Sequence, residues 1–322
     1  MPRPEEIQFR AGDLALAGEL LLPDESADRH PWALLLPSFG PRDRDGSFDR
    51  ARHPGWFADR TDEDGGLLAR LAHALADAGV ASFRFDVRGC GASDGSWEAS
   101  DLFSRIDDAR DAVAAMRSHG GLDLRRSGIV AHGEGALLAI SVAIGDPVLS
   151  ALTLIGAPAR SARDVLRRGA AERERTGEDR EHPFVVALDR GLEELIERAG
   201  RHEAEMRLPV GGGAGASLSL AGWRQAFDTP GLALATMLRR SVTLVHGDRD
   251  AWVDPDESEL LAAALRAAGG APEVRRIPGT DHDLAGADAA TIALIGDDLA
   301  GRLVPRDLPP VLLAIEGEPP TG

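Results

Sequence analysis

The sequence contains a single cysteine, no lysine and no tyrosine, and each absence narrows the available chemistry. With Cys90 alone, no disulfide can form within the chain, and nothing indicates an oxidising compartment. The lack of lysine excludes a Schiff-base lysine. No stretch approaches the roughly 18 apolar residues that a transmembrane helix needs, and the opening MPRPEEIQFRAGD is acidic where a signal peptide is basic and then apolar. We therefore expect a cytoplasmic protein without membrane contact.

The chain is also poor in positive charge, with a formal net charge of −17. Nucleic-acid backbones and anionic membrane surfaces would repel it, so neither is an expected partner. A small molecule or another protein fits better, and the sequence leaves a homodimer open. The histidines show no metal-ligand spacing, so we expect no metal site and no cofactor.

Short apolar runs alternate with longer helical patterns, which is typical of a mostly parallel sheet with crossover helices. Leu14–Leu22 alternates like a half-exposed strand, whereas Trp32–Leu36 is a continuous apolar run suited to a central strand buried on both faces. The same reasoning predicts strands at 81–86, 127–131, 151–155, 241–245 and 273–277, and helices at 67–78, 101–116, 136–144, 256–268 and 289–303. A chain of 322 residues suits one large α/β domain with an insertion.

The alternation stops near residue 160 and resumes at residue 241, which divides the chain into three parts. Residues 1–159 and 241–305 are predicted to form the α/β core, residues 160–240 a helical cap or lid, and residues 306–322 a proline-rich C-terminal tail. A glycine-rich stretch in the predicted lid, residues 211–215, lies too far from any strand-to-helix turn to be a phosphate loop. We interpret it as a hinge.

Three motifs follow the carboxyl ends of predicted strands, where open α/β sheets bind their ligands. The turn AHGEG places Gly133 between a strand and a helix, with small neighbours that permit a strained backbone. Further along the chain, LVHGDRD brings Asp250 onto a loop after one strand, and PGTDH brings His282 onto a loop after the next.

With these motifs the chain resembles the α/β-hydrolase superfamily, in particular bacterial esterases related to dienelactone hydrolase and prolyl oligopeptidase. The resemblance runs from about residue 14 to residue 303, and its marks are RFDVRGCGASDGSW, GPRDRDGSF, SGIVAHGEGALL, LVHGDRD and PGTDH. It implies the α/β-hydrolase fold, with a mostly parallel central sheet flanked by helices and a helical lid insertion. It also implies that Asp250 is the acid and His282 the general base, and that the backbone N–H groups of Phe39 and Glu134 form the oxyanion hole.

Two positions depart from the family pattern. The nucleophile position holds Gly133, which has no side-chain atom able to attack a carbonyl, so an acyl-enzyme cannot form there. The oxyanion loop opens on Pro37 and Ser38 where the family has His-Gly, and proline has no N–H to donate. Both changes fall on hydrolytic parts of the site, while the acid and base remain.

Three hypotheses about function follow. The leading one is a serine-independent enzyme, in which a His282/Asp250 dyad and the oxyanion hole act on a small, mainly apolar ester, lactone or acyloxy compound. The reaction would be an elimination of the lyase type or a water-mediated hydrolysis. The second is a catalytically inactive relative that binds a ligand or a partner protein. The third is an esterase inactivated by a serine-to-glycine replacement at Gly133.

Four other residues near these motifs are open to two interpretations each. Ser38 would donate a hydrogen bond to the substrate or serve as a displaced nucleophile. Arg42 would contact the substrate or join a solvated network of ion pairs in its loop. Trp252 would line a pocket or anchor the lid to the core. Glu134 would place a carboxylate beside Gly133, although family members often carry a glutamate there without catalytic use.

Overall fold

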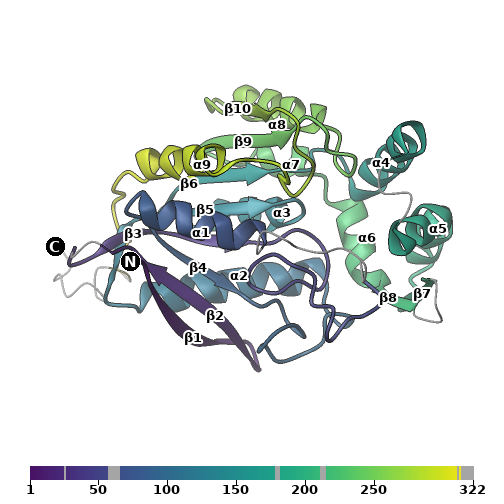
Figure 1. The fold of residues 1–322 in the computed structure, drawn as a ribbon, viewed down its shortest axis with the longest axis horizontal. Helices are drawn as coiled ribbons and strands as arrows, with labels where there is room; N and C mark the ends of the chain where they lie inside the picture. Colours follow the sequence, from purple (N-terminus) through teal and green to yellow (C-terminus); the bar gives the residue numbers. More distant parts are fainter. Residues whose placement is uncertain (25–26, 57–65, 178–181, 211–214, 310–311, 313–322) are drawn as a thin grey trace.

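The computed structural model describes residues 1–24, 27–56, 66–177, 182–210, 215–309 and 312 (Figure 1). Within these residues one sheet has eight strands, in the spatial order β1-β2-β4-β3-β5-β6-β9-β10. The strands are β1 (Arg3–Ala11), β2 (Leu14–Leu22), β3 (His30–Leu36), β4 (Ala81–Phe85), β5 (Leu122–His132), β6 (Leu149–Ile155), β9 (Ser241–Gly247) and β10 (Glu273–Ile277). All neighbours from β4 to β10 pair in parallel, whereas β1 and β2 pair antiparallel with each other, as do β2 and β4.

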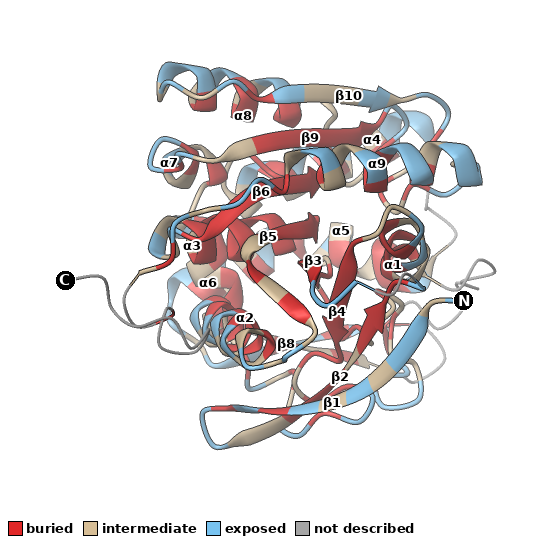
Figure 2. Cartoon of the chain, turned by 90° about the vertical axis from the view of Figure 1, so that its left-hand side faces the viewer, coloured by how far each residue is buried: buried red, intermediate tan, exposed pale blue. Residues whose placement is uncertain are grey.

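Strand β3 lies inside the sheet and supplies side chains to both faces. Trp32, Leu34 and Leu36 enter one hydrophobic cluster, and Ala33 and Leu35 enter another on the opposite face. This explains the continuous apolar run, because a parallel strand covered on both faces needs apolar residues at every position. Figure 2 shows the contrast with β1 at the edge of the sheet, where many positions are exposed.

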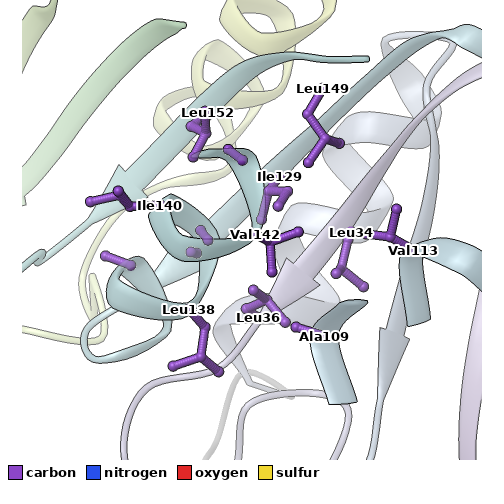
Figure 3. Close-up of a cluster of buried hydrophobic side chains, with 14 of the residues drawn as sticks. Leu34, Leu36, Ala109, Val113, Ile129, Leu138, Ile140, Val142, Leu149 and Leu152 are labelled. Carbon is purple, nitrogen blue, oxygen red and sulfur yellow. The ribbon is translucent and has the colours of Figure 1, made fainter. Parts of the chain in front are cut away.

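Helices cover both faces of the sheet. Helices α1 (Leu67–Asp77) and α9 (Ala289–Arg302) pack against each other on one face. The other face carries α2 (Leu102–Arg117), α3 (Gly135–Gly145), α8 (Asp256–Ala267) and the short α7 (Gly231–Ala235). The close-up of this second cluster shows Leu34 and Leu36 of β3 among side chains of α2, α3, β5 and β6 (Figure 3).

Between β6 and β9 the chain leaves the sheet and forms α4 (Ala162–Thr176), α5 (Pro183–Gly200), β7 (Glu205–Pro209), β8 (Gly215–Ser219) and α6 (Leu220–Asp228). We call these five elements the inserted segment. In Figure 1 they lie beyond the carboxyl ends of the central strands, on the opposite side from the N-terminus. They form a hydrophobic cluster with side chains from core loops, including Phe48, Trp56 and Trp97.

The fold differs from the sequence-based expectation at four places. Strand β1 was not predicted, because RPEEIQFRA is rich in charge and resembles a loop. The inserted segment is not purely helical, since β7 and β8 pair as an antiparallel hairpin. Helix α7, assigned to the predicted lid, packs with α3 and α8 on the core. Strand β5 begins at Leu122, five residues before the predicted start.

Two predicted segments are described only in part. Of the predicted hinge, residues 211–214 lie outside the described residues. In the C-terminal tail, the backbone N–H of Arg306 donates to the carbonyl of Arg125 at 2.9 Å. Leu308 and Leu312 are buried with Leu124 and Val148, so the described part of the tail is packed against the core.

Candidate active site

Asp250 lies on the loop after β9, and hydrogen-bond donors surround its buried carboxylate. Its Oδ1 accepts the backbone N–H groups of Trp252 and Val253, each at 2.8 Å. Its Oδ2 lies 3.1 Å from Nε2 of His246 and 2.7 Å from Nδ1 of His282. Burial by itself raises the pKa of Asp250, but the two histidines and their hydrogen bonds outweigh it and leave the pKa well below its ordinary value. The carboxylate is therefore ionised at neutral pH.

His282 lies on the loop after β10, and Asp250 fixes the tautomer of its neutral form. An ionised carboxylate only accepts hydrogen bonds, so the proton of the neutral ring is on Nδ1 and Nε2 carries the lone pair. Burial lowers the pKa of His282, but the charge and hydrogen bond of Asp250 raise it more, so the net pKa lies above 6.5. Nε2 is thus a stronger base than an ordinary histidine nitrogen.

His132, the last residue of β5, contacts both the backbone and the ring of His282. Its Nε2 donates to the backbone carbonyl of His282 at 2.9 Å, and the two ring centroids are 4.5 Å apart. Burial, together with the nearby charge of His282, lowers the pKa of His132 to about 3. His132 is therefore neutral and positions the loop that carries His282.

Gly133 occupies the sharp turn between β5 and α3 with a φ of +53°, in the left-handed region. A Cβ atom added there would stand 2.0 Å from Oγ of Ser38 and 3.0 Å from Nε2 of His282. The hydroxyl of Ser38 itself lies 3.3 Å from Nε2 of His282. Ser38 therefore fills the place where the first side-chain atom at residue 133 would otherwise stand.

The two residues predicted to supply oxyanion donors, Phe39 and Glu134, come from adjoining loops and both line the cavity beside Gly133. Glu134 is the N-cap of α3 and makes no side-chain cap hydrogen bond. In the described part of the chain, neither its N–H nor that of Phe39 is hydrogen-bonded to an acceptor. Free amides at a helix start attract negative charge. The predicted pair of oxyanion donors is thus brought to one site with both N–H groups unengaged.

The side chain of Glu134 has a structural partner. Both of its oxygens accept from Nη2 of Arg105, at 3.0 and 2.9 Å, and the guanidinium lies 4.9 Å from the ring centroid of Trp97. Burial raises the pKa of Glu134, and the charge of Arg105 opposes that effect. This ion pair ties the start of α3 to α2.

Arg42 is buried, so the expectation of a solvated ion-pair network was wrong for this residue. Its Nε donates to the carbonyl of Phe39 at 3.2 Å, and its Nη1 lies 3.6 Å from Oδ1 of Asp283. The guanidinium also stacks 4.1 Å from the ring centroid of Phe48. Arg42 therefore holds the loop after β3 in place and joins it to the loop of His282.

A cavity of about 130 Å³ lies between these loops and the inserted segment. Gly133 and His282 line it, and so do the three predicted substrate contacts Ser38, Arg42 and Trp252. The remaining lining is mainly apolar. The inserted segment contributes Ala162, Val165, Leu166, Phe184, Leu188, Trp223 and Ala226, and the core and its loops contribute Phe39, Phe48, Trp56, Leu137, Pro158 and Val253, with Glu134, Arg160 and Asp283.

Two residues of the site were not found from the sequence. His246 donates to Asp250 while its Nδ1 lies 2.6 Å from Oγ of Ser258; its position four residues before Asp250 in HGDRD was a usable signal. Arg105 lies on a different helix from Glu134, and no local pattern indicates their pairing.

No group of three or more histidine, cysteine, aspartate or glutamate side chains among the described residues is arranged to hold a metal ion. No described helix is both long and apolar enough to cross a bilayer.

Solved structures with this architecture are numerous, and the following are similar to the chain over nearly its whole length. Est1E of Butyrivibrio proteoclasticus, solved with ferulic acid bound, is 16% identical with a TM-score of 0.65, covering 92% of this chain and 98% of its own. The esterase domain of a Rhodothermus marinus protein is 17% identical with a TM-score of 0.57, covering 94% and 97%. The hypothetical protein PA2218 of Pseudomonas aeruginosa is 16% identical with a TM-score of 0.63, covering 94% of each chain.

The chain therefore has the α/β-hydrolase fold, with its largely parallel central sheet flanked by helices, and the fold predicted from its motifs is confirmed. Within that class, residues 56–176 match the family model of serine aminopeptidase, S33. A comparison with curated proteins finds no match to the sequence.

Proposed function

We propose that the protein is an ester hydrolase for small carbonyl compounds with an apolar acyl group, and that His282, positioned by Asp250, is its general base. One observation carries this proposal. Nε2 of His282 is deprotonated in the neutral ring, is hydrogen-bonded to the hydroxyl of Ser38, and opens onto an apolar cavity. This is the geometry that a base needs to activate an oxygen nucleophile.

Hydrolysis fits this geometry better than elimination does. An elimination requires the base to reach a C–H bond of the substrate, whereas the hydrogen bond of Nε2 is already directed at an O–H group. The expected rate enhancement is sufficient for an activated ester. A positioned base accelerates the reaction about 10²- to 10⁴-fold, and an oxyanion donor about 10²- to 10³-fold. Phe39 and Glu134 would supply these donors from their backbone.

The cavity favours an acyl group that is apolar and includes an aromatic ring. Trp56 and Trp223 both line the cavity and contact the ring of Phe39, with ring centroids 5.8 and 4.6 Å from it. Its volume is close to that of cavities that hold benzene. The ferulic acid bound to the similar Est1E structure is an aromatic acid and supports the same substrate class.

The test compares wild type with His282→Ala on p-nitrophenyl esters of acetic, butyric, octanoic and cinnamic acids, with products identified by mass spectrometry. We expect hydrolysis by wild type, with a loss of about 10²- to 10⁴-fold in kcat/KM for His282→Ala. His119→Ala is the matched control, because His119 is a partly exposed histidine that contacts Glu5 far from the cavity.

Three results would contradict the proposal. Equal rates for wild type and His282→Ala would mean that the histidine is not the base. Products that lack the mass of added water would indicate elimination. A wild type that binds these esters without converting any of them would identify a binding protein.

A further inference from the structure

We infer that Ser38 is the nucleophile of this site, so that the chain carries a complete Ser38–His282–Asp250 triad whose serine has moved from the turn after β5 to the loop after β3. The inference rests on the proposed function, since it names the group that His282 activates there. It makes Gly133 a requirement of the site, because a side chain at 133 would occupy the space of the Ser38 hydroxyl.

The hydrogen-bond chain is continuous from acid to hydroxyl. Asp250 Oδ2 accepts from Nδ1 of His282 at 2.7 Å, and Nε2 of His282 lies 3.3 Å from Oγ of Ser38. Because Nδ1 carries the ring proton, Nε2 accepts, and the hydroxyl of Ser38 is the donor. These are the contacts by which a histidine base removes the proton of an attacking serine.

The move of the serine exchanges the roles of the two loops and keeps the oxyanion donors. In the family pattern, one donor is the N–H of the residue after the nucleophile and the other comes from the loop after the third strand. With Ser38 as nucleophile, Phe39 becomes the residue after it, and Glu134 becomes the donor from the opposite loop. The same two N–H groups, which make no backbone hydrogen bond, would therefore act as oxyanion donors for a serine at residue 38 as well as for one at residue 133.

The backbone around Ser38 is held in the position that this role needs. A Cβ atom at Gly135 would lie 2.5 Å from the carbonyl oxygen of Pro37, so the loop after β3 packs directly on the first turn of α3. Pro37 has a fixed φ, and Arg42 donates to the carbonyl of Phe39 at 3.2 Å. Ser38 is itself only partly buried and lines the cavity, so a substrate carbonyl can reach its oxygen.

The reaction balances without any co-reactant except water. Oγ of Ser38 forms a bond to the ester carbonyl carbon while its proton passes to Nε2 of His282. The N–H groups of Phe39 and Glu134 take up the oxyanion, the bond to the alcohol oxygen breaks, and His282 returns the proton to the departing alcohol. Water then attacks the acyl group on Ser38 and gives its proton to His282. The acid leaves, and His282 returns that proton to Oγ.

The experiment labels the protein with diethyl p-nitrophenyl phosphate, which transfers a diethylphosphoryl group to an activated serine and releases p-nitrophenolate. Peptide mass mapping then locates the label. We expect one equivalent on Ser38 in wild type, none in Ser38→Ala or His282→Ala, and a loss of about 10³-fold or more in kcat/KM for Ser38→Ala. Ser141→Ala is the control, because Ser141 lies on α3 with its hydroxyl bonded to the carbonyl of Leu137 at 2.7 Å.

Ser38→Cys keeps a nucleophile at residue 38 and tests the inference even if the alanine variant fails to fold. We expect iodoacetamide to alkylate this variant at residue 38, and only when His282 is present to deprotonate the new thiol. The native thiol of Cys90 should not react, because burial raises its pKa.

The outcomes separate this inference from the proposed function. A folded Ser38→Ala that keeps wild-type turnover, while His282→Ala loses it, would overturn Ser38 as nucleophile and leave a general-base hydrolase in which water attacks directly. A label on another serine, or no label together with an unreactive Ser38→Cys, would also overturn it. Turnover that survives both Ser38→Ala and His282→Ala would reject the proposed function as well.

Discussion

The hydroxyl of Ser38 and the missing side chain of Gly133 occupy the same space: a Cβ on Gly133 would stand 2.0 Å from Oγ of Ser38. The two loops that carry these residues follow β3 and β5, which are neighbouring parallel strands. Their carboxyl ends therefore meet at one edge of the sheet. The glycine at the turn after β5 thus leaves the space that the serine of the loop after β3 occupies.

Gly133→Ala is expected to displace Ser38 and lower activity by more than about tenfold, since a 1 Å misplacement in an active site can cost about 10²-fold. A positive φ adds a cost of about 1 to 2 kcal/mol in the free energy of unfolding. Gly12→Ala isolates that backbone cost, because Gly12 has a φ of +58° and no atom within 4 Å of an added Cβ. Kinetics and thermal unfolding of both variants check this. Full activity in Gly133→Ala would show that the two side chains do not compete.

The rate should depend on pH with a single acidic limb. The base form of His282 is required, and Asp250 holds the pKa of His282 above 6.5 despite burial. As pH falls through that pKa, the ring gains a proton and kcat/KM declines, so the midpoint lies above 6.5. Asp250→Asn removes the charge that raises the pKa, and the midpoint should fall while the rate drops by about 10⁴-fold. A midpoint that Asp250→Asn leaves in place would indicate that another group titrates.

Arg105→Met should destabilise the protein by about 3 to 5 kcal/mol, because it leaves the carboxylate of Glu134 buried without a cation. The double variant Arg105→Met/Glu134→Gln should recover part of this loss, because the uncompensated charge is gone. Arg110→Met is the control: Arg110 and Asp107 form an exposed pair, which is worth about 0 to 1 kcal/mol. Urea unfolding measures all three. Equal losses for Arg105→Met and Arg110→Met would argue against the buried pair.

Leu166→Phe should narrow the acyl specificity. Leu166 belongs to α4 and lines the cavity, so a larger side chain there shortens the space for the acyl group. We expect kcat/KM for the octanoyl ester to fall about 10- to 200-fold relative to the acetyl ester. Leu260→Phe on α8, which packs against the core outside the cavity, should leave that ratio unchanged. A uniform loss on all esters would mean that Leu166 does not contact the acyl chain.

The sequence allowed good prediction of the elements that depend on local pattern. Trp32–Leu36 was recognised as a buried strand because every position is apolar, and Asp250 and His282 were placed on loops because each follows a short strand. The prediction failed where charge masked a strand, as in β1, and where a hairpin lay within a charged, helix-favouring block, as in β7 and β8.

The closeness of Ser38 and Gly133 could not be predicted from the sequence. A displaced nucleophile was one of the interpretations of Ser38, but choosing it requires knowing how closely two loops 95 residues apart in the chain approach each other. That approach follows from Gly135 packing against the carbonyl of Pro37, a contact that leaves no periodic signal. The pairing of Arg105 with Glu134 was hidden for the same reason.

The decisive measurement is the position of the diethylphosphoryl label in the exchange variant Ser38→Gly/Gly133→Ser. This variant places a serine at the turn where a nucleophile elbow normally holds one, and removes the hydroxyl that would collide with it. A label on residue 38 in wild type and on residue 133 in the exchange variant, with ester hydrolysis in both, is the expected result. Absence of label at residue 38 in wild type, with label and turnover appearing only in the exchange variant, would mean that Ser38 is not the nucleophile and that the site lost its serine.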